Sequence, residues 1–475
     1  MASFLRTILI VCSLALFFET SLAHISLNRQ MNMVYAGKQY SFNGQLINHF
    51  NPQDRRTFSQ RYWVADEFYV PTSSSPIILY ICGEATCNGT PGEGSFPYQV
   101  AQKAGALLVA LEHRYYGLSQ PFGPNSMKTE NMIYLTVEQA LEDLANFMQW
   151  FKVNYKYRIS DNQPWVTVGG SYPGALSAWF RYKYPHLTAG AWASSAVVNA
   201  ILDFSDFEYQ IYLAVSKSGP KCPQTIQDLT SYFEDQLYKT SSEDQKKFKQ
   251  RFGENALKLS HEELLWYIAD MFVLQVQYGK RAELCNLLTT QPSFDALVDA
   301  IIELFVRSSD VKMYGSYFVS NSTFEAEMED EIGRQWNYQV CSQLGWFQTP
   351  AKNSAYVLRS QRINIDFYKQ FCKNAYGKAL WPDVDRFNLD FGGVDFITTN
   401  VVNTNGCEDP WQWAAKNTTT GSITSIYINC DGCAHCVDFH GAKSGDPTSL
   451  QQAHTQIQKL ILSYFGKSSQ ETIKI

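Results

Sequence analysis

This sequence of 475 residues lacks a surplus of basic residues, a low-complexity tract and an internal repeat. Its 39 Lys and Arg residues are outnumbered by 45 Asp and Glu residues, and the net charge of -6 excludes the basic surface typical of nucleic-acid binding. Beyond its first residues, no run reaches the roughly 18 apolar residues that a membrane helix requires. A hydrophobic content of 45% predicts a globular chain with a large core, and the length suggests two structural units.

The first 23 residues have the pattern of a secretory signal peptide, with Arg6 before an apolar run at 8–18 and small residues for cleavage at 21–23. Eleven cysteines are present and one lies in this leader, so ten remain, and an even number in an oxidising compartment favours disulfides. Three glycosylation sequons begin at Asn88, Asn321 and Asn417. We therefore expect a secreted protein or one of the lysosomal or endosomal lumen.

Residues 75–200 alternate short β-rich runs with helical stretches. The pattern predicts strands at 77–82, 106–112, 165–168 and 189–194, and helices at 98–104, 137–155 and 175–184. Strands that are separated by helices pair in parallel, which predicts an α/β sheet with its ligand site at the carboxyl ends of the strands.

The pattern becomes mainly helical after residue 200. Helices are expected at 204–216, 225–237, 243–252, 262–278 and 294–306, strands return at 396–402 and 422–429, and a last helix follows at 450–465. The predicted organisation is a signal peptide (1–23), an α/β domain in two parts (24–200 and 387–475), and a helical insertion (201–386). The aromatic residues of the insertion are expected in its core, although a few could form an apolar slot suited to proline. They include Trp266, Tyr267, Phe272, Tyr314, Tyr317 and Phe318.

Residues 166–174 have the pattern of a nucleophile elbow, in which Ser171 follows two glycines at the junction of a strand and a helix. A serine on such a tight turn needs small neighbours, and the helix that follows directs its free N–H groups at developing negative charge. Pro173 replaces the second glycine of the usual G-x-S-x-G pattern, which the first turn of a helix tolerates. A glycine-flanked serine is a weak signal by itself, so its partners must decide.

Candidates for a base and an orienting carboxylate follow the two late strands, in the order Ser, Asp, His that is usual for this kind of sheet. Asp409 precedes a proline that restrains its backbone, and His435 would take the Ser171 proton while Asp409 holds its tautomer. Asp431 and Asp438 compete for the carboxylate role, but both lie on the loop of His435. Each residue alone has a structural reading: an Asp-Pro turn, or a capping histidine.

Six short blocks of sequence are informative because they occur together and in this order: 57–62, 112–119, 169–172, 336–341, 405–411 and 435–438. Together they resemble the serine peptidase family that contains lysosomal Pro-X carboxypeptidase, dipeptidyl peptidase II and thymus-specific serine protease. The resemblance implies an α/β-hydrolase domain with a large, mainly helical insertion over the active site. It also implies exopeptidase activity, no cofactor or metal, and a triad of Ser171, Asp409 and His435. The dipeptide Gly83-Glu84, and Cys436 after the histidine, favour the thymus-specific type within this family.

Further site residues follow from geometry and from the resemblance. The oxyanion hole needs two donors, which we expect at the backbone of Tyr172 and near Gly83. The resemblance implies that Glu84 contacts substrate, while Gln343 stands where the family usually has Glu. It also implies two disulfides, Cys341–Cys372 and Cys222–Cys285.

Two other patterns could suggest different chemistry. The cysteines at 430, 433 and 436, with His435 among them, have the spacing of a zinc site, but a secreted chain favours disulfides and the family needs no metal. His113 follows a strand end, and we interpret it as a scaffold residue that ties loops together.

These observations predict a secreted or endolysosomal serine exopeptidase that hydrolyses short peptides next to proline through an acyl-enzyme. The alternatives are an esterase or lipase of the same fold, because a triad alone does not separate esters from amides, and a catalytically silent binding protein. Its partners would be peptide substrates. The sequence leaves open which peptide end is cleaved, the pH optimum and the oligomeric state, for which a homodimer is one option.

Overall fold

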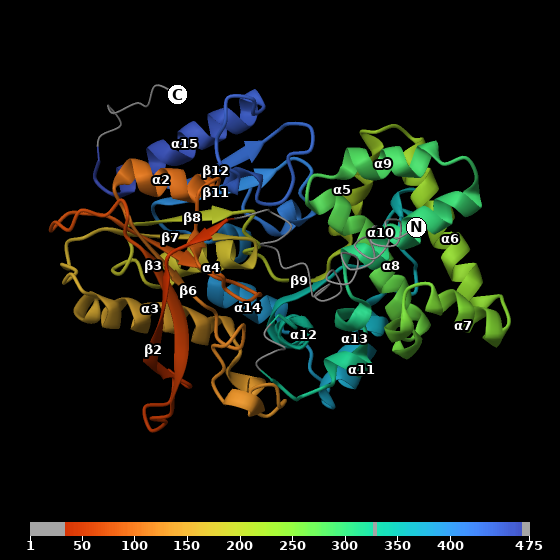
Figure 1. Cartoon of the computed structure of the whole chain (residues 1–475), viewed down its shortest axis with the longest axis horizontal. Coiled ribbons are helices and arrows are strands. Elements are labelled where there is room, and N and C mark those ends of the chain that lie inside the picture. The colour runs from red at the N-terminus through yellow and green to blue at the C-terminus, as the bar shows by residue number, and fades with distance from the viewer. Residues whose placement is uncertain (1–33, 326–329, 468–475) are drawn as a thin grey trace, which may run out of the picture.

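The computed structural model describes residues 34–325 and 330–467, so the expected signal peptide lies outside the described residues. An eight-stranded sheet with the order β12-β11-β8-β7-β4-β6-β3-β2 forms the centre of one half of the molecule (Figure 1). The six strands from β12 to β6 pair in parallel, as expected, while β3 and β2 are antiparallel. Their bounds are β2 (Lys38–Leu46), β3 (Thr57–Ala65), β4 (Ile77–Ile81), β6 (Leu107–Leu111), β7 (Trp165–Gly170), β8 (Gly190–Ser194), β11 (Val401–Gly406) and β12 (Ile423–Ile428).

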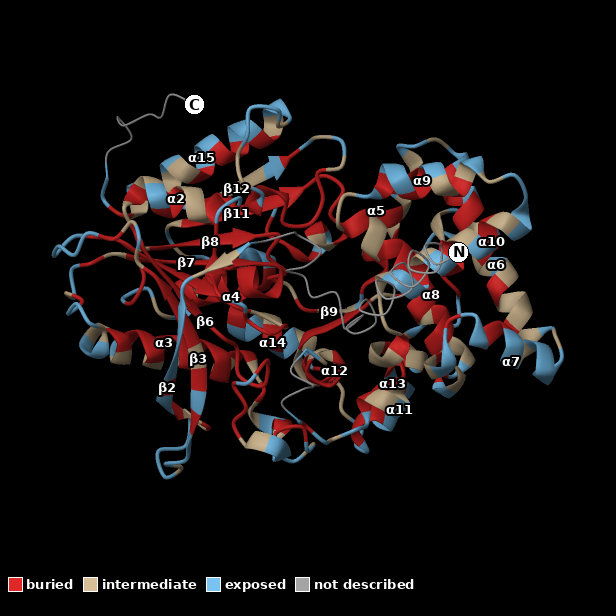
Figure 2. Cartoon of the chain, viewed as in Figure 1, coloured by how far each residue is buried: buried red, intermediate tan, exposed pale blue. Residues whose placement is uncertain are grey.

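Helices cover both faces of this sheet, which explains why its central strands are continuous apolar runs. In β4 every residue is buried: Ile77 and Leu79 belong to one hydrophobic core, and Ile78 belongs to the core on the opposite face. The first face carries α3 (Val137–Asn154) and α4 (Tyr172–Lys183), and the second carries α2 (Phe96–Ala104) and α15 (Thr448–Tyr464). Figure 2 shows the central strands of the sheet as continuously buried. The fold is that of an α/β hydrolase.

The helical insertion lies beside the sheet in Figure 1. It contains α5 (Ser205–Ser216), α6 (Lys221–Tyr238), α7 (Ser242–Gln250), α8 (His261–Gln277), α9 (Arg281–Thr290), α10 (Phe294–Ser308), α11 (Ser316–Val319), α12 (Gly333–Gln339) and α13 (Ile365–Tyr376). Two short parallel strands pair the start of the insertion, β9 (Ile201–Asp203), with the segment between α12 and α13, β10 (Gly345–Phe347). The expected end of the insertion, residue 386, lies inside α14 (Val384–Phe391), whose Phe387 packs on Trp179 of α4 with ring centroids 5.3 Å apart.

The strand predicted at 396–402 is displaced in the structure. The apolar and β-branched residues before position 400 suggest a strand, but Asn400 has a φ of 57° and interrupts the extended backbone. The strand β11 instead runs from Val401 to Gly406, so its polar residues Asn403 and Asn405 are buried in the sheet. Polar side chains at these positions concealed the true register.

Four disulfides link the described chain. Cys222–Cys285 joins α6 to α9 and Cys341–Cys372 anchors α13, which are the two pairings that the family resemblance implied. Cys82–Cys87 and Cys430–Cys433 close short loops, and Cys407 and Cys436 are buried free thiols. Among the described residues, no helix combines the length and the apolar character needed to cross a bilayer.

Candidate active site

Ser171 lies in the turn between β7 and α4, at the carboxyl end of a central strand. Its φ of 64° and ψ of -131° are unusual for a residue with a side chain, as a nucleophile elbow requires. The turn is held by two backbone hydrogen bonds: Ser171 N donates to Ser194 O at 2.9 Å, and Ala175 N donates to Ser171 O at 3.0 Å. The strained turn therefore belongs to a fixed local framework.

Close backbone approach explains two of the glycines around this turn. A β-carbon on Gly169 would lie 2.2 Å from the carbonyl oxygen of Pro173, and one on Gly83 would lie 2.1 Å from the Pro173 ring. The proline that departs from the usual motif thus packs directly on the loop after β4. Gly83 makes room for it, which couples the elbow to the loop that is expected to supply an oxyanion donor.

Asp409 and His435 meet after β11 and β12, and both side chains are fully buried. The ring Nδ1 of His435 lies 2.9 Å from Oδ2 and 3.0 Å from Oδ1 of Asp409, and Trp411 N donates to Oδ1 at 2.9 Å. Since a carboxylate only accepts, Nδ1 carries a proton and donates it to Asp409, and Nε2 is the ring atom left to exchange a proton with a substrate or a serine. Nε2 is buried and has no hydrogen-bond partner among the described residues.

The two competing carboxylates are engaged elsewhere. Asp438 accepts hydrogen bonds from Trp192 Nε1 at 2.8 Å and Ser194 Oγ at 2.6 Å, while Asp431 pairs with Arg281. Asp409 is therefore the carboxylate that contacts the His435 ring. Burial lowers the pKa of His435, but the adjacent Asp409 carboxylate outweighs this effect and holds that pKa well above its ordinary value.

Two sets of contacts relate this pair to Ser171. Tyr278 and Trp411, whose ring centroids lie 6.3 and 6.4 Å from that of His435, line a cavity together with Ser171. In addition, the thiol sulfur of Cys436 lies 2.9 Å from the place that a β-carbon of Gly170 would occupy. The residues next to His435 and next to Ser171 are thus in contact.

A buried chain of hydrogen bonds holds the residue after Ser171. Tyr116 Oη donates to Gln339 Oε1 at 2.6 Å, Gln339 Nε2 donates to Tyr172 Oη at 2.9 Å, and Tyr172 Oη lies 3.0 Å from His113 Nε2. Burial lowers the pKa of His113 to about 4, so its ring is neutral. Its Nδ1 then donates to Arg114 O at 2.7 Å and its Nε2 accepts from Tyr172. His113 positions Tyr172, which agrees with its scaffold interpretation.

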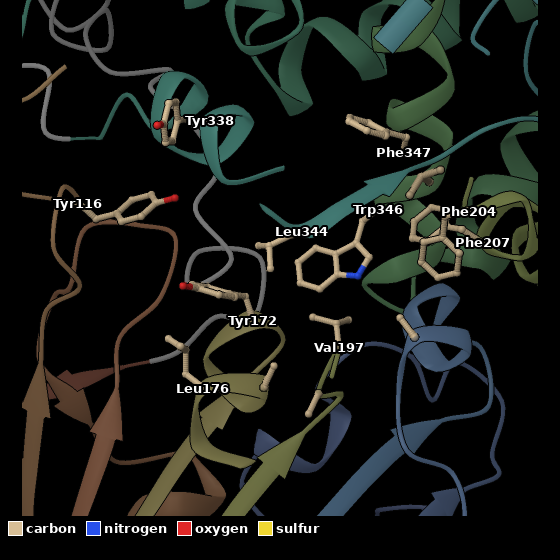
Figure 3. Packing of buried hydrophobic residues seen from close by; sticks show 14 of the residues in the cluster. Tyr116, Tyr172, Leu176, Val197, Phe204, Phe207, Tyr338, Leu344, Trp346 and Phe347 are labelled. Atoms are coloured by element: carbon tan, nitrogen blue, oxygen red, sulfur yellow. The ribbon is translucent and has the colours of Figure 1, made fainter. Parts of the chain in front are cut away.

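The cavity beside Ser171 has a volume of about 170 Å³ and lies between the sheet and the insertion. A second cavity of about 70 Å³ shares several of its walls, including Asp270 and Trp336, and is largely aromatic. Its ring-bearing lining residues include Trp266, Tyr314, Trp336, Trp346, Tyr368 and Phe371. Figure 3 shows Trp346 between Val197, near the sheet, and Phe204 and Phe207 of the insertion.

Two carboxylic acids face the cavity of Ser171. Glu84, expected to contact substrate, has a buried Oε2 without a hydrogen-bond partner among the described residues, and burial raises its pKa to about 7. Asp270, on α8, was not anticipated; burial raises its pKa to about 6. Gln343 does not line the cavity, because its side chain contacts Val137 N and Glu138 at the start of α3. The acidic character of the cavity therefore comes from Glu84 and Asp270.

The remaining expectations concern cysteines and sequons. Cys430 and Cys433 are bonded to each other, so their sulfurs do not form the zinc site that their spacing resembles. No cluster of three His, Cys, Asp or Glu residues suited to a metal occurs in the part of the chain that the structure describes. Asn88, Asn321 and Asn417 are all exposed, as glycosylation would require.

Comparison with known proteins identifies the family. A family model described as Serine carboxypeptidase S28 matches residues 45–457. The chain belongs to this S28 family. It is similar to "Probable serine protease EDA2" of Arabidopsis thaliana, with 36% identity over 90% of this chain and 86% of the relative. It is also similar to the thymus-specific serine protease of Mus musculus (28%, covering 87% and 85%) and the lysosomal Pro-X carboxypeptidase of Pongo abelii (28%, covering 86% and 85%).

The family assignment makes this chain a serine peptidase and confirms the resemblance seen in its six blocks. One residue of the cavity was missed by sequence reasoning. Asp270 is the one acid beyond the first turn of helix α8, between the buried Ile268 and Met271. A charged side chain next to the buried face of a helix is a signal for function, and it was hidden by treating α8 only as a core helix.

Proposed function

We propose that this S28 peptidase is an exopeptidase that cleaves short peptides next to proline, with Ser171 as nucleophile, His435 as base and Asp409 as orienting carboxylate. The observation that carries this proposal is the buried His435–Asp409 pair at the strand ends beside the elbow of Ser171. Its free Nε2 is the atom that a serine hydroxyl would use. In hydrolases without substrate this hydrogen bond commonly tightens only when the substrate binds.

In the proposed reaction, Ser171 Oγ attacks the carbonyl carbon of the scissile bond while His435 Nε2 takes its proton. The negative oxygen of the tetrahedral intermediate would accept hydrogen bonds from Tyr172 N and from the backbone at Gly83. His435 then gives the proton to the leaving amine, and the acyl group stays on Ser171. Water, activated by the same imidazole, hydrolyses this acyl-enzyme and restores the serine.

The size of the cavity supports cleavage near a chain end. At about 170 Å³ it is smaller than typical ligand pockets of 300–1,000 Å³. The insertion narrows it with Asp270 and Leu274 from α8 and Trp336 from α12. A continuous peptide would need a long groove, whereas a terminus can enter a small pocket. The adjoining aromatic cavity has the apolar, flat walls that suit a proline ring.

The disulfides and exposed sequons support a route through the secretory pathway, so we place the enzyme outside the cell or in the endolysosomal lumen. A shift in gel mobility after enzymatic removal of N-glycans would test that route.

The activity is tested with a fluorophosphonate probe and a peptide library. Wild type should be labelled and Ser171→Ala should not, which separates the enzyme from a silent binding protein. The library should give short terminal fragments at proline. Hydrolysis of simple esters without hydrolysis of any peptide would favour the esterase alternative and refute the proposal.

A further inference from the structure

We propose that Glu408, the residue before Asp409, is a positioning residue of the triad, through which the insertion holds the two loops that carry Asp409 and His435. This inference rests on the proposed function and adds a residue on which its acid–base pair depends. Glu408 is not among the described residues that line the cavity of Ser171, so it acts through its neighbours without touching substrate.

Glu408 joins the two triad loops through its backbone and through its side chain. Its carboxylate is fully buried and follows β11. Its N–H donates to Cys433 O at 2.8 Å, and its Oε1 accepts a hydrogen bond from Gly432 N at 3.1 Å. Both partners shortly precede His435 in the sequence. The loop of Asp409 is therefore fastened to the loop of His435 close to the pair itself.

The insertion supplies the positive charges for this carboxylate. Arg281 of α9 has a buried guanidinium, whose Nε lies 3.1 Å from Oε2 of Glu408 and whose Nη2 lies 3.4 Å from Oε1. Lys217, directly after α5, places Nζ 3.1 Å from Oε1. Arg281 also pairs with Asp431, but that carboxylate is 80% exposed and solvent screens the pair. Glu408 is therefore the buried counter-charge on which the Arg281 guanidinium depends.

The same end of the insertion contacts His435 directly. His435 N donates to Gln277 O at 3.0 Å, and Trp411 Nε1 donates to Gln277 Oε1 at 3.0 Å. A β-carbon on Gly279 would lie 2.8 Å from Gly432 O, so the turn between α8 and α9 meets the His435 loop at backbone distance. Gln277 also lines the cavity beside the elbow. One end of α8 thus forms a wall of this cavity and fixes the backbone of the proposed base.

Removing the charge of Glu408 should therefore slow the chemistry more than it weakens binding. The hydrogen bond from His435 Nδ1 depends on where Asp409 lies, and a displacement of about 1 Å in such a site can cost roughly 100-fold in rate. On the best peptide from the library, we expect Glu408→Gln to lower kcat by about 10- to 100-fold and to keep KM within about threefold of wild type. The kcat of each variant is referred to the amount of Ser171 that a fluorophosphonate titrates, so that unfolded molecules do not count.

Asp143→Asn is the matched control. Asp143 of α3 is also a buried acid, with Oδ1 2.6 Å from Nη2 of the buried Arg114, so its replacement removes a comparable ion pair that does not belong to the triad loops. We expect this variant to lose stability, as Glu408→Gln does, and to keep kcat near that of wild type. An equal fall of kcat in both variants would indicate a general loss of order and would overturn the inference.

Proton NMR reports on the acid–base pair itself. A short, charge-assisted hydrogen bond moves the resonance of its proton far downfield, and Asp409→Asn identifies the signal of His435 Nδ1–H because it removes the acceptor. This signal should weaken or move upfield in Glu408→Gln and should persist in Asp143→Asn. A wild-type signal or a wild-type kcat in Glu408→Gln would remove the assigned role.

Lys217 provides the test if Glu408→Gln does not fold, because its side chain is 40% exposed and tolerates replacement. Lys217→Met should lower kcat by about threefold or more, which is less than the effect of Glu408→Gln because Arg281 remains. Lys217→Arg keeps the charge and should restore kcat. A wild-type kcat in Lys217→Met would then overturn the inference.

Fluorophosphonate labelling of wild type separates the two levels of failure. If wild type is not labelled, the proposed function fails, and this inference fails with it. If wild type is labelled and Glu408→Gln keeps the wild-type kcat, only the inference fails.

Discussion

Replacing Glu84 by Gln should make the protein more stable relative to wild type as the pH rises from 4 to 8. Burial, partly offset by a hydrogen bond to its own backbone, raises the pKa of Glu84 from 4.5 to about 7. Because each tenfold change in proton affinity corresponds to about 1.4 kcal/mol, keeping this group charged costs roughly 3 kcal/mol. The variant avoids that cost, since an amide does not titrate.

The sign of the pH dependence follows from proton linkage. Glu84 binds its proton more tightly in the folded chain than in the unfolded chain, so the wild type loses stability as the pH rises from 4.5 to about 7. The advantage of Glu84→Gln should therefore grow from a few tenths of a kcal/mol at pH 4 to about 3 kcal/mol at pH 8. The pH-independent cost of burying an amide cancels in this comparison.

Thermal unfolding at pH 4, 6 and 8 measures this difference. The entropy of unfolding for a chain of this length is about 0.9 kcal/mol/K, so the Tm of the variant should rise by about 3 °C relative to wild type between pH 4 and pH 8. Glu283→Gln, on an exposed position of α9, is the control and should give a Tm difference that barely changes with pH. A Tm difference for Glu84→Gln that is the same at pH 4 and pH 8 would refute the reasoning.

Three further changes probe the elbow and its partners. Asp409→Asn should lower kcat by on the order of 10⁴, because the wrong tautomer of His435 would be favoured, while the exposed rival Asp431→Asn stays near wild type in steady-state assays. Gly83→Ala should lower kcat by about 10²–10³ with less effect on KM, because its β-carbon would collide with Pro173. Gly445→Ala is the control, because the space around Gly445 is open. Equal kcat values for the two variants would contradict the coupling of the elbow to the loop after β4. Tyr172→Phe should lower the free energy of unfolding in urea by roughly 1–3 kcal/mol, because His113 and Gln339 lose a buried partner, and an unchanged urea midpoint would rule out that network.

The elbow and the parallel sheet could be predicted because their signals are local. A glycine pair before Ser171 and an apolar run such as β4 report directly on a tight turn and on a strand buried on both faces. The order of Ser171, Asp409 and His435 added a constraint that a single motif lacks. The structure then distinguishes Asp409 from Asp438 by partners that are far apart in the chain, Trp192 and Ser194.

The features that escaped prediction depend on distant contacts. The antiparallel pair β2 and β3 lies at the sheet edge, where β2 is mostly exposed and gives no long apolar run. The start of β11 is set by the left-handed Asn400, and its buried asparagines look like loop residues in the sequence. Asp270 becomes meaningful only when α8 folds over the sheet and brings it into the cavity of Glu84 and Ser171.

Stability and ligand binding have the same physical origin in this cavity. Glu84 and Asp270 are raised in pKa because burial removes water and leaves one oxygen of each without a partner. A hydrogen-bond donor of a peptide substrate that enters the cavity would supply such a partner, so it would recover free energy that the empty site lacks. If Glu84→Gln gave no pH-dependent gain in stability, the carboxyl would already be solvated, and the expected gain from pairing it with a substrate donor would lose its physical basis.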